Sequence, residues 1–248
     1  MRAEAIVDLS AIKHNVAILK EKSGTQLLAV VKADAYGHGL VPVAKAALDA
    51  GAAMLGVALL EEAISLREAG ITAPILAWLV QPGSDYKSAI DLDIDLAAGS
   101  IKALHEIQAA SQNKKARVHL ELDTGMTRGG FLGEWTQLVA ADVAGLEIVG
   151  VFSHFARADE PAENQNAEQL ARFEEMVATL HSFGFTNVVR HLSNSAATLT
   201  NPAAAYEMVR TGIAMYGLTP DVAMGSSQEF GIRPAMQLRA ALYLVKDV

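Results

Sequence analysis

The sequence predicts an α/β protein built as a closed (β/α)8 barrel, and three observations support this fold class. The chain has 248 residues, about the length that one such barrel uses as a single domain. Eight short aliphatic runs alternate with stretches of helical spacing, as a parallel sheet covered by helices requires. The first run is not followed by the GxGxxG turn that is typical of an open, doubly wound sheet.

The eight expected strands are rich in Val, Leu, Ile and Ala, which is typical of strands buried on both faces. They lie at 26–31, 53–58, 74–79, 94–97, 117–123, 146–152, 187–192 and 207–210. Hydrophobic residues make up 51% of the chain, which is enough to fill one large core.

Helices are expected between these strands, and the clearest one spans 164–183. Its apolar residues recur every three or four positions, from Leu170 through Phe173 to Leu180, and Gly184 ends the pattern. Three earlier helical stretches also end in a glycine just before a strand, where a left-handed cap is needed. These glycines are Gly24, Gly51 and Gly70. The regular βα alternation favours closure of the sheet into a barrel.

Residues 1–9 and 234–248 lie outside the eight βα units, which we assign to a barrel domain of residues 10–233. From Met236 onwards apolar and other residues alternate as in a strand, and the chain stops at Val248 without a turn or cap. We expect this segment to begin a β-rich domain that is cut short, and the N-terminal segment to be a strand that pairs with it. Unpaired apolar strand edges predict self-association.

Composition excludes several classes of function. The net charge is −8, from 20 Lys and Arg against 28 Asp and Glu, without a basic block, which argues against nucleic acid as a partner. The chain has no cysteine, which excludes disulfides, thiolate metal sites and cysteine nucleophiles. Neither a signal-peptide core nor an apolar run of about 18 residues is present, so we expect a cytoplasmic protein that does not contact the membrane.

Candidate site residues are the polar ones that follow the strands, because active sites of barrels lie at the C-terminal strand ends. Each of the first, fifth, sixth, seventh and eighth strands contributes to this set. Its members are Lys32, Arg128, His154, Asn194, Ser195, Arg210, Gly212 and Ile213. All are expected to face one mouth of the barrel.

Two features of this set indicate a phosphorylated ligand beside an amine. Lys32 closes an apolar strand, and partial desolvation there favours the neutral amine that forms Schiff bases. Asn194 and Ser195 precede a short helical stretch whose free N–H groups suit a phosphate, and Gly212 and Ile213 offer two more donors. Taken alone, the lysine is a solvated strand end and the asparagine a helix cap.

The segment AVVKADAYGHG, which contains Lys32, resembles the cofactor-lysine motif of bacterial alanine racemases, a fold-type III class of pyridoxal-phosphate enzymes. Four further segments match blocks of this family in the expected order. They are DTGMTR, GVFSHFARAD, HLSNSAATL and VRTGIAMYG. The resemblance implies a cytoplasmic isomerase, homodimeric when intact, that uses pyridoxal 5′-phosphate to interconvert L-alanine and D-alanine and so supplies D-alanine for peptidoglycan.

The resemblance also implies a role for the residues that face the reacting atoms. Lys32 binds the cofactor as a Schiff base and acts as the base for the hydrogen of D-alanine. His154 lies against the pyridine ring, and Arg128 reaches the phenolic oxygen of the cofactor and the substrate carboxylate. Arg210 donates to the ring nitrogen and does not give up its proton, so the ring stays unprotonated and transamination is suppressed.

A second group of residues is implied for the cofactor phosphate. Tyr36 and Ser195 hydrogen-bond it, helped by backbone groups of Gly212 and Ile213, and Asn194 supports that loop.

The sequence departs from the family at two places. Many members carry a carbamylated lysine seven residues before the arginine of DTGMTR, and this chain has Glu121 there. RVHLELD alternates, so Glu121 shares a face with His119 and Asp123, and it is a surface charge unless that face points into the barrel. If it does, Glu121 supplies permanently the carboxylate that orients Arg128. The family's β domain, whose tyrosine serves the L face across the dimer, is absent, so we expect an impaired barrel.

Two alternatives were weighed. A single-domain pyridoxal-phosphate homeostasis barrel carries the cofactor on a lysine without racemase activity, but Tyr36, His38 and the tail after Pro234 favour the racemase. A metal-dependent hydrolase lacks its usual His-x-His and HExxH signatures here, and Arg210 would repel a dication, so we expect no metal. The ligands in that case would be His38, His154, His191 and Asp34. Substrates such as serine or larger amino acids, and dimerisation of this chain, stay open.

Overall fold

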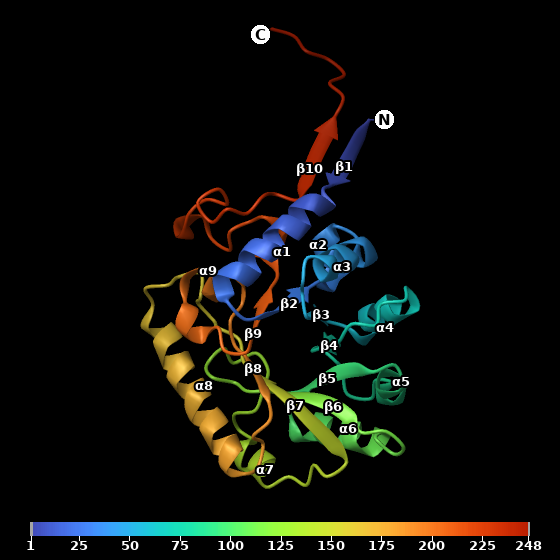
Figure 1. The fold of residues 1–248 in the computed structure, drawn as a ribbon, viewed down its shortest axis with the longest axis vertical. Helices are drawn as coiled ribbons and strands as arrows, with labels where there is room; N and C mark the ends of the chain where they lie inside the picture. The colour runs from blue at the N-terminus through green and yellow to red at the C-terminus, as the bar shows by residue number, and fades with distance from the viewer. Residues whose placement is uncertain (1, 248) are drawn as a thin grey trace.

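Eight parallel strands form a nearly closed barrel in a computed structural model of the chain, which describes residues 2–247 (Figure 1). The hydrogen-bonded order of the strands is β9-β2-β3-β4-β5-β6-β7-β8. Their bounds are β2 (Gln26–Val30), β3 (Met54–Val57), β4 (Ile75–Ala77), β5 (Ile94–Ala98), β6 (Ala116–Glu121), β7 (Leu146–Phe152), β8 (Val189–His191) and β9 (Met208–Thr211). Each overlaps one of the eight predicted runs, so the predicted fold class is confirmed.

The barrel closes between β8 and β9, which lie side by side without forming a regular ladder. The backbone N–H of Arg210 in β9 donates to the carbonyl of Ser193, just after β8, at 2.9 Å. This contact brings the loops after the last two strands together at the same end of the barrel.

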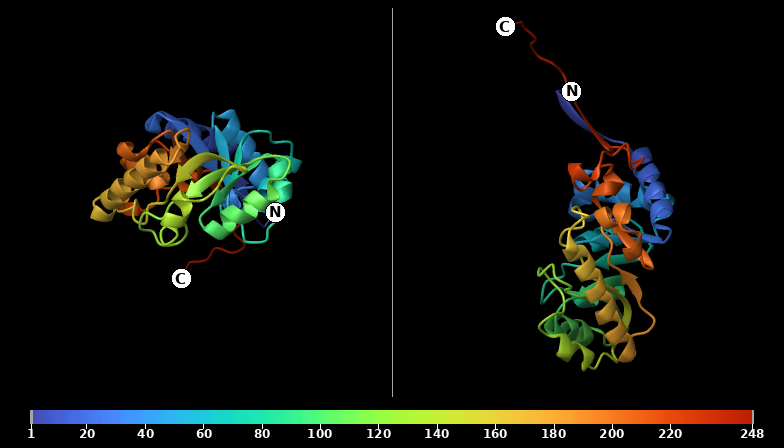
Figure 2. Two further views of the ribbon diagram at one scale, coloured as in Figure 1. Left: turned by 90° about the horizontal axis from the view of Figure 1, so that it is seen from below. Right: turned by 90° about the vertical axis from the view of Figure 1, so that its left-hand side faces the viewer.

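Helices cover the outside of the sheet (Figure 2). They are α1 (Leu9–Ser23), α2 (Lys32–Gly37), α3 (Leu40–Asp49), α4 (Leu60–Glu68), α5 (Tyr86–Asp91), α6 (Ile101–Ala110), α7 (Trp135–Val139), α8 (Asn164–Ser182) and α9 (Ser195–Thr200), with 3-10 turns η1 (Pro202–Ala204), η2 (Ile213–Tyr216) and η3 (Val222–Met224). The predicted helix at 164–183 is therefore confirmed as α8. Gly24, Gly51, Gly70 and Gly184 all have positive φ, as expected at helix ends. Within residues 2–247 no helix combines the length and apolar character needed to cross a membrane.

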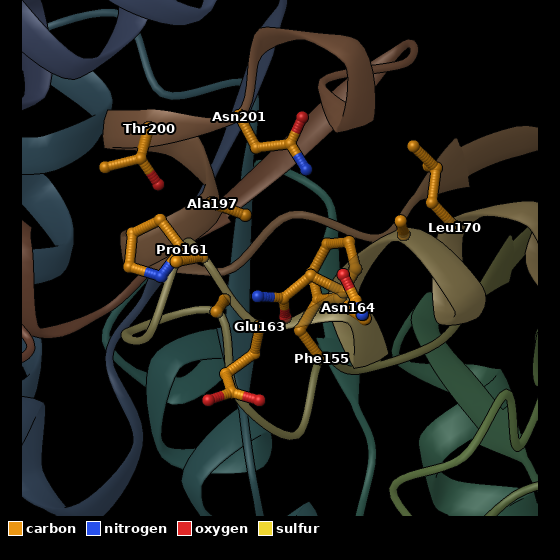
Figure 3. Close-up of a pocket in the computed structure, with 12 residues that line it drawn as sticks. Phe155, Pro161, Glu163, Asn164, Leu170, Ala197, Thr200 and Asn201 are labelled. Atoms are coloured by element: carbon orange, nitrogen blue, oxygen red, sulfur yellow. The ribbon is translucent and has the colours of Figure 1, made fainter.

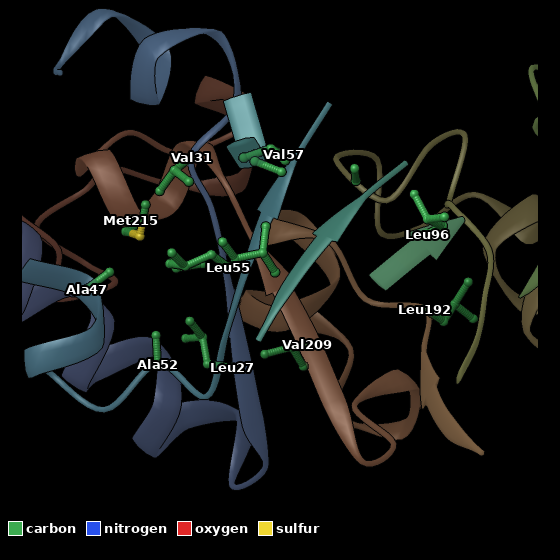
Figure 4. Packing of buried hydrophobic residues seen from close by; sticks show 14 of the residues in the cluster. Leu27, Val31, Ala47, Ala52, Leu55, Val57, Leu96, Leu192, Val209 and Met215 are labelled. Atoms are coloured by element: carbon green, nitrogen blue, oxygen red, sulfur yellow. The ribbon is translucent and has the colours of Figure 1, made fainter. Parts of the chain in front are cut away.

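Apolar side chains on the two faces of the strands fill two separate regions. Leu27, Leu55 and Val209 point outward and pack with helix residues such as Ala47 (Figure 4). A smaller cluster contains strand residues only, among them Leu28, and fills the barrel interior. Burial on both faces explains why the strand sequences are nearly continuous apolar runs.

The two terminal strands form a separate sheet that projects from the barrel (Figure 1). Strand β1 (Ala3–Val7) pairs antiparallel with β10 (Met236–Ala240), with Ala3 opposite Ala240. Leu238 and Tyr243 remain strongly exposed on this projection. The division of the chain at residues 10 and 233 stays a prediction, and Met1 and Val248, at the ends of the expected terminal segments, lie outside the described residues.

Candidate functional site

One pocket at the C-terminal ends of the barrel strands is lined by every residue predicted to bind the cofactor or the substrate, but not by Asp34, His38 and His191, three ligands of the metal alternative. Its volume is about 410 Å³. The ten residues are Lys32, Tyr36, Glu121, Arg128, His154, Asn194, Ser195, Arg210, Gly212 and Ile213. The structure therefore brings these residues together, whereas the individual roles assigned to them stay predictions.

A second pocket of similar volume lies between the start of α8 and α9 (Figure 3). Phe155, Pro161 and Leu170 give it apolar walls, and Glu163 is the one ionisable side chain among its lining residues. By contrast, the pocket at the barrel mouth is lined by several ionisable side chains, among them those of Lys32, Glu121, Arg128, His154 and Arg210. We therefore place the candidate site at the barrel mouth.

Element α2, which begins at Lys32, is a left-handed turn and not a right-handed helix. Ala33, Asp34, Ala35 and Tyr36 have φ values of 53°, 52°, 54° and 56°, and a left-handed conformation costs residues with a Cβ roughly 1–2 kcal/mol each. Surrounding contacts must therefore hold the turn, and strain of this kind is concentrated at functional sites. Sequence reasoning missed this turn, because none of its residues is glycine.

The left-handed turn places Tyr36 over Gly212. A Cβ atom on Gly212 would lie 2.6 Å from the Tyr36 hydroxyl oxygen, so any larger residue there would displace this hydroxyl. Ser195 Oγ accepts from the N–H groups of Gly212 and Ala214 at 2.9 and 3.3 Å. Asn194 caps α9, since its Oδ1 accepts from the third amide of that helix at 3.1 Å. Two hydroxyls and several amides thus converge on one corner of the pocket.

Arg210 lies at the floor of the pocket and is almost fully buried. Its Nη2 donates to the carbonyl of Ser153 at 2.7 Å and lies 3.2 Å from His154 Nδ1. Burial lowers the pKa of Arg210 to about 10, an effect that Glu121 opposes and Arg128 reinforces. Although this pKa is below the usual arginine range, the side chain remains a cation at neutral pH.

A buried hydrogen-bonded array extends from Arg210 through the barrel interior. His191 Nδ1 lies 3.3 Å from Arg210 Nη1, His191 Nε2 lies 2.8 Å from His119 Nδ1, and His119 Nε2 lies 3.3 Å from Asp95 Oδ2. An ionised carboxylate only accepts hydrogen bonds, so His119 carries its proton on Nε2 and donates to Asp95. His119 Nδ1 is then an acceptor, and His191 donates to it from Nε2. Burial raises the pKa of Asp95, but hydrogen bonds from His119 and Arg117 outweigh this effect and lower it.

His191 is neutral in this array, since burial, His119 and Arg210 all lower its pKa well below the ordinary value. From the sequence, His191 was expected only as a possible metal ligand. Among residues 2–247 no group of three or more acidic or histidine side chains is arranged to hold a metal ion.

Glu121 points into the barrel, so its interpretation as a surface charge is wrong. Its Oε2 lies against two glycines, because a Cβ on Gly99 or Gly129 would come within 3.1 Å of it. Burial raises the pKa of Glu121, and the charges of Arg128 and Arg210 partly offset this effect. The proposed action of Glu121 on Arg128 stays a prediction.

His154 is a neutral ring at the pocket wall. Burial, followed by the positive charges of Arg210, Arg128 and Lys32, lowers its pKa to about 3. Gln169 Nε2 donates to the His154 carbonyl at 3.0 Å and fixes the strand end that carries the ring.

Several lining residues were not singled out from the sequence, among them Trp78, Met126, Phe152 and Asp159. Trp78 lies at the end of the predicted strand 74–79 and Asp159 follows the predicted strand 146–152, and these positions are the signal that could have identified them. Phe152 is the last residue of β7, where its apolar character suggested only a core position.

Comparisons with known proteins agree along the whole chain. Residues 7–220 match the family model described as alanine racemase, N-terminal domain. The chain is 46% identical over 255 residues to the alanine racemase of Salinispora tropica, covering 100% of this chain and 68% of that protein. It is 48% identical over 255 residues to the alanine racemase of Thermobifida fusca, covering 99% and 67%.

Among solved structures, the alanine racemase from D-cycloserine producing Streptomyces lavendulae superposes with a TM-score of 0.97 at 45% identity. The match covers 100% of this chain and 67% of that one. The chain thus spans about two thirds of the length of these relatives.

Proposed function

Because the chain belongs to the alanine racemase family, we propose that its barrel mouth binds pyridoxal 5′-phosphate and takes part in the interconversion of L-alanine and D-alanine. The observation that carries this proposal is the single pocket in which Lys32, Tyr36, Ser195 and Arg210 meet. When bound, the cofactor supplies the electron-withdrawing group that makes the α hydrogen of an amino acid removable.

The residues present fit the phosphate of this cofactor. The hydroxyls of Tyr36 and Ser195 flank Gly212, where any side chain would fill the space. The backbone amide of Ile213 lies in the same corner and is suited to bind a phosphate oxygen, whereas the Gly212 N–H donates to Ser195 Oγ at 2.9 Å and holds that hydroxyl in place. Asn194 holds the start of α9 and so keeps Ser195 in place.

Lys32 and Arg128 act at the opposite end of the ligand. Lys32 Nζ would hold the cofactor covalently and, once the amine of the substrate has replaced it, would accept or return the α hydrogen on the face used by D-alanine. Arg128 binds the substrate carboxylate, and Glu121, which lines the same pocket, supplies the negative charge that orients this guanidinium.

Arg210 and His154 set the charge around the cofactor ring. Arg210 has a pKa of about 10, so it would donate an N–H to the ring nitrogen while keeping its proton at neutral pH. His154, with a pKa of about 3, would lie against the ring without adding charge. An unprotonated ring draws electrons less strongly, which favours return of the proton over transamination.

The proposal also covers the intact enzyme. The chain spans about two thirds of the length of its relatives. We place the base that acts on the hydrogen of L-alanine in the part of those relatives that this chain does not cover, contributed by the partner subunit of a homodimer. D-Alanine formed in this way serves peptidoglycan synthesis. No observation favours a cofactor-carrying barrel without racemase activity, because the relatives named above are alanine racemases over the whole chain.

The covalent role of Lys32 can be tested by borohydride reduction of the chain after incubation with pyridoxal phosphate. Peptide mapping should locate the reduced adduct on Lys32. An adduct on another lysine, or no saturable adduct, would contradict the proposed function.

A further inference from the structure

Glu62 joins two loops at the barrel mouth through a single carboxylate. It is the third residue of α4, and its Oε2 accepts from the N–H groups of Ala58 and Leu59 at 2.9 and 3.0 Å. Its Oε1 accepts from the N–H of Ala33 at 2.6 Å. The strands before these two loops, β2 and β3, are neighbours in the barrel, which places the loops side by side.

The hydrogen bond from the Ala33 N–H to Glu62 fixes the start of the left-handed turn. Ala33 directly follows Lys32 and is the first residue with positive φ. Within the turn the N–H of Ala35 donates to the carbonyl of Val31 at 2.8 Å, whereas the Ala33 N–H donates to Glu62. A side chain from a different βα unit therefore fixes the point where the chain changes handedness.

Other contacts hold the far end of the turn. Asp34 Oδ1 accepts from the N–H of Leu40 at 2.7 Å, and the Tyr36 ring lies 4.8 Å from the ring of Tyr216. The Tyr216 hydroxyl in turn donates to the carbonyl of Val30, the last residue of β2, at 2.9 Å. With both ends held, the turn sets the positions of Lys32 and Tyr36 relative to each other.

We propose that Glu62 is a positioning residue of this site, which holds the left-handed turn so that Lys32 and Tyr36 reach the same ligand. This inference rests on the proposed function, because the ligand is pyridoxal phosphate. Both carboxylate oxygens are used, one on each loop. A glutamine has one acceptor oxygen, and its amide nitrogen would face an N–H group, so it serves only one loop.

The test compares Glu62→Gln with Glu61→Gln in the full chain. Glu61 lies on the same first turn of α4, is exposed, and takes no part in the bonds to Ala33, Ala58 or Leu59. Titration with pyridoxal phosphate should show about tenfold weaker binding for Glu62→Gln, the factor expected for one hydrogen bond to a charged group, and no change for Glu61→Gln. Equal affinities for Glu62→Gln and wild type would overturn the proposal.

A double-mutant cycle with Tyr36→Phe separates positioning from a general loss of stability. If Glu62 acts by placing Tyr36 relative to Lys32, Glu62→Gln weakens pyridoxal phosphate binding much less in the Tyr36→Phe background than in wild type. An equal loss in both backgrounds would show that Glu62 does not act through the placement of Tyr36 and would refute the positioning role.

Glu62→Asp provides a second variant in case Glu62→Gln does not fold. It keeps the charge at the start of α4 but is one methylene too short to bridge both loops, so the same weakened binding is expected. Wild-type affinity in Glu62→Asp would contradict the proposal. Failure of wild type itself to bind pyridoxal phosphate would contradict the proposed function instead, which keeps the two failures distinct.

Discussion

The space above Gly212 provides a quantitative test of the proposed phosphate site, which is formed by Tyr36, Ser195 and Gly212. In Gly212→Ala the new Cβ would lie 2.6 Å from the Tyr36 hydroxyl oxygen and 3.3 Å from its Cζ, so the tyrosine must move away. A displaced hydroxyl loses its hydrogen bond to a charged phosphate, which is worth about 1.5–3 kcal/mol. The affinity for pyridoxal phosphate should therefore fall by about 10- to 100-fold.

The assay is an absorbance titration of wild type, Gly212→Ala and Gly133→Ala with pyridoxal phosphate and, separately, with pyridoxal. Gly133→Ala is the matched control, because nothing lies within 4 Å of its new Cβ. Pyridoxal lacks the phosphate, so its affinity should change little in Gly212→Ala. An unchanged affinity for pyridoxal phosphate, or an equal loss for both compounds, would refute the placement of the phosphate.

Three further predictions concern the amine, the buried carboxylate and the exposed tail. Lys32→Ala should abolish the pyridoxal phosphate adduct fixed by borohydride, whereas Lys45→Ala should retain it. Mass spectrometry of the peptides shows whether the adduct is present in each variant. Burial raises the pKa of Glu121, so its ionisation costs the folded state stability as pH rises through that pKa. Glu121→Gln should thus melt at a higher temperature than wild type at about pH 8 but not at about pH 4, and a lower melting temperature at the higher pH would contradict this. Leu242 and Leu244 are 84% and 70% exposed, so changing both to serine should reduce self-association in light scattering. Unchanged association would mean that another surface is responsible.

The strands and the composition of the site could be predicted from sequence because both follow from local patterns. Each barrel strand is a short apolar run, and closure brings the residues after all eight runs to one mouth. Helix α8 could be predicted for the same reason, since apolar residues recur at helical spacing along its 19 residues and Gly184 follows its end.

Two features of the site could not be predicted in this way. The turn at Ala33 to Tyr36 opposes the local preferences of its residues, and contacts from α4 and η2 hold it. The array of Asp95, His119 and His191 joins side chains from three strands, which become neighbours only when the barrel forms. Tertiary contacts decide both features, so no local pattern reports them.

The central claim is that Lys32 acts on one face of an amino acid held by pyridoxal phosphate at this mouth. It is tested most directly by proton NMR of D-alanine and L-alanine, each incubated in deuterated water with the cofactor-loaded chain. A positioned acid–base group contributes about 10²–10⁴-fold, so the Cα hydrogen of D-alanine should exchange faster than that of L-alanine by at least the lower factor. Equal exchange from both enantiomers at a high rate would show that residues 1–248 supply a second base, and would contradict the account.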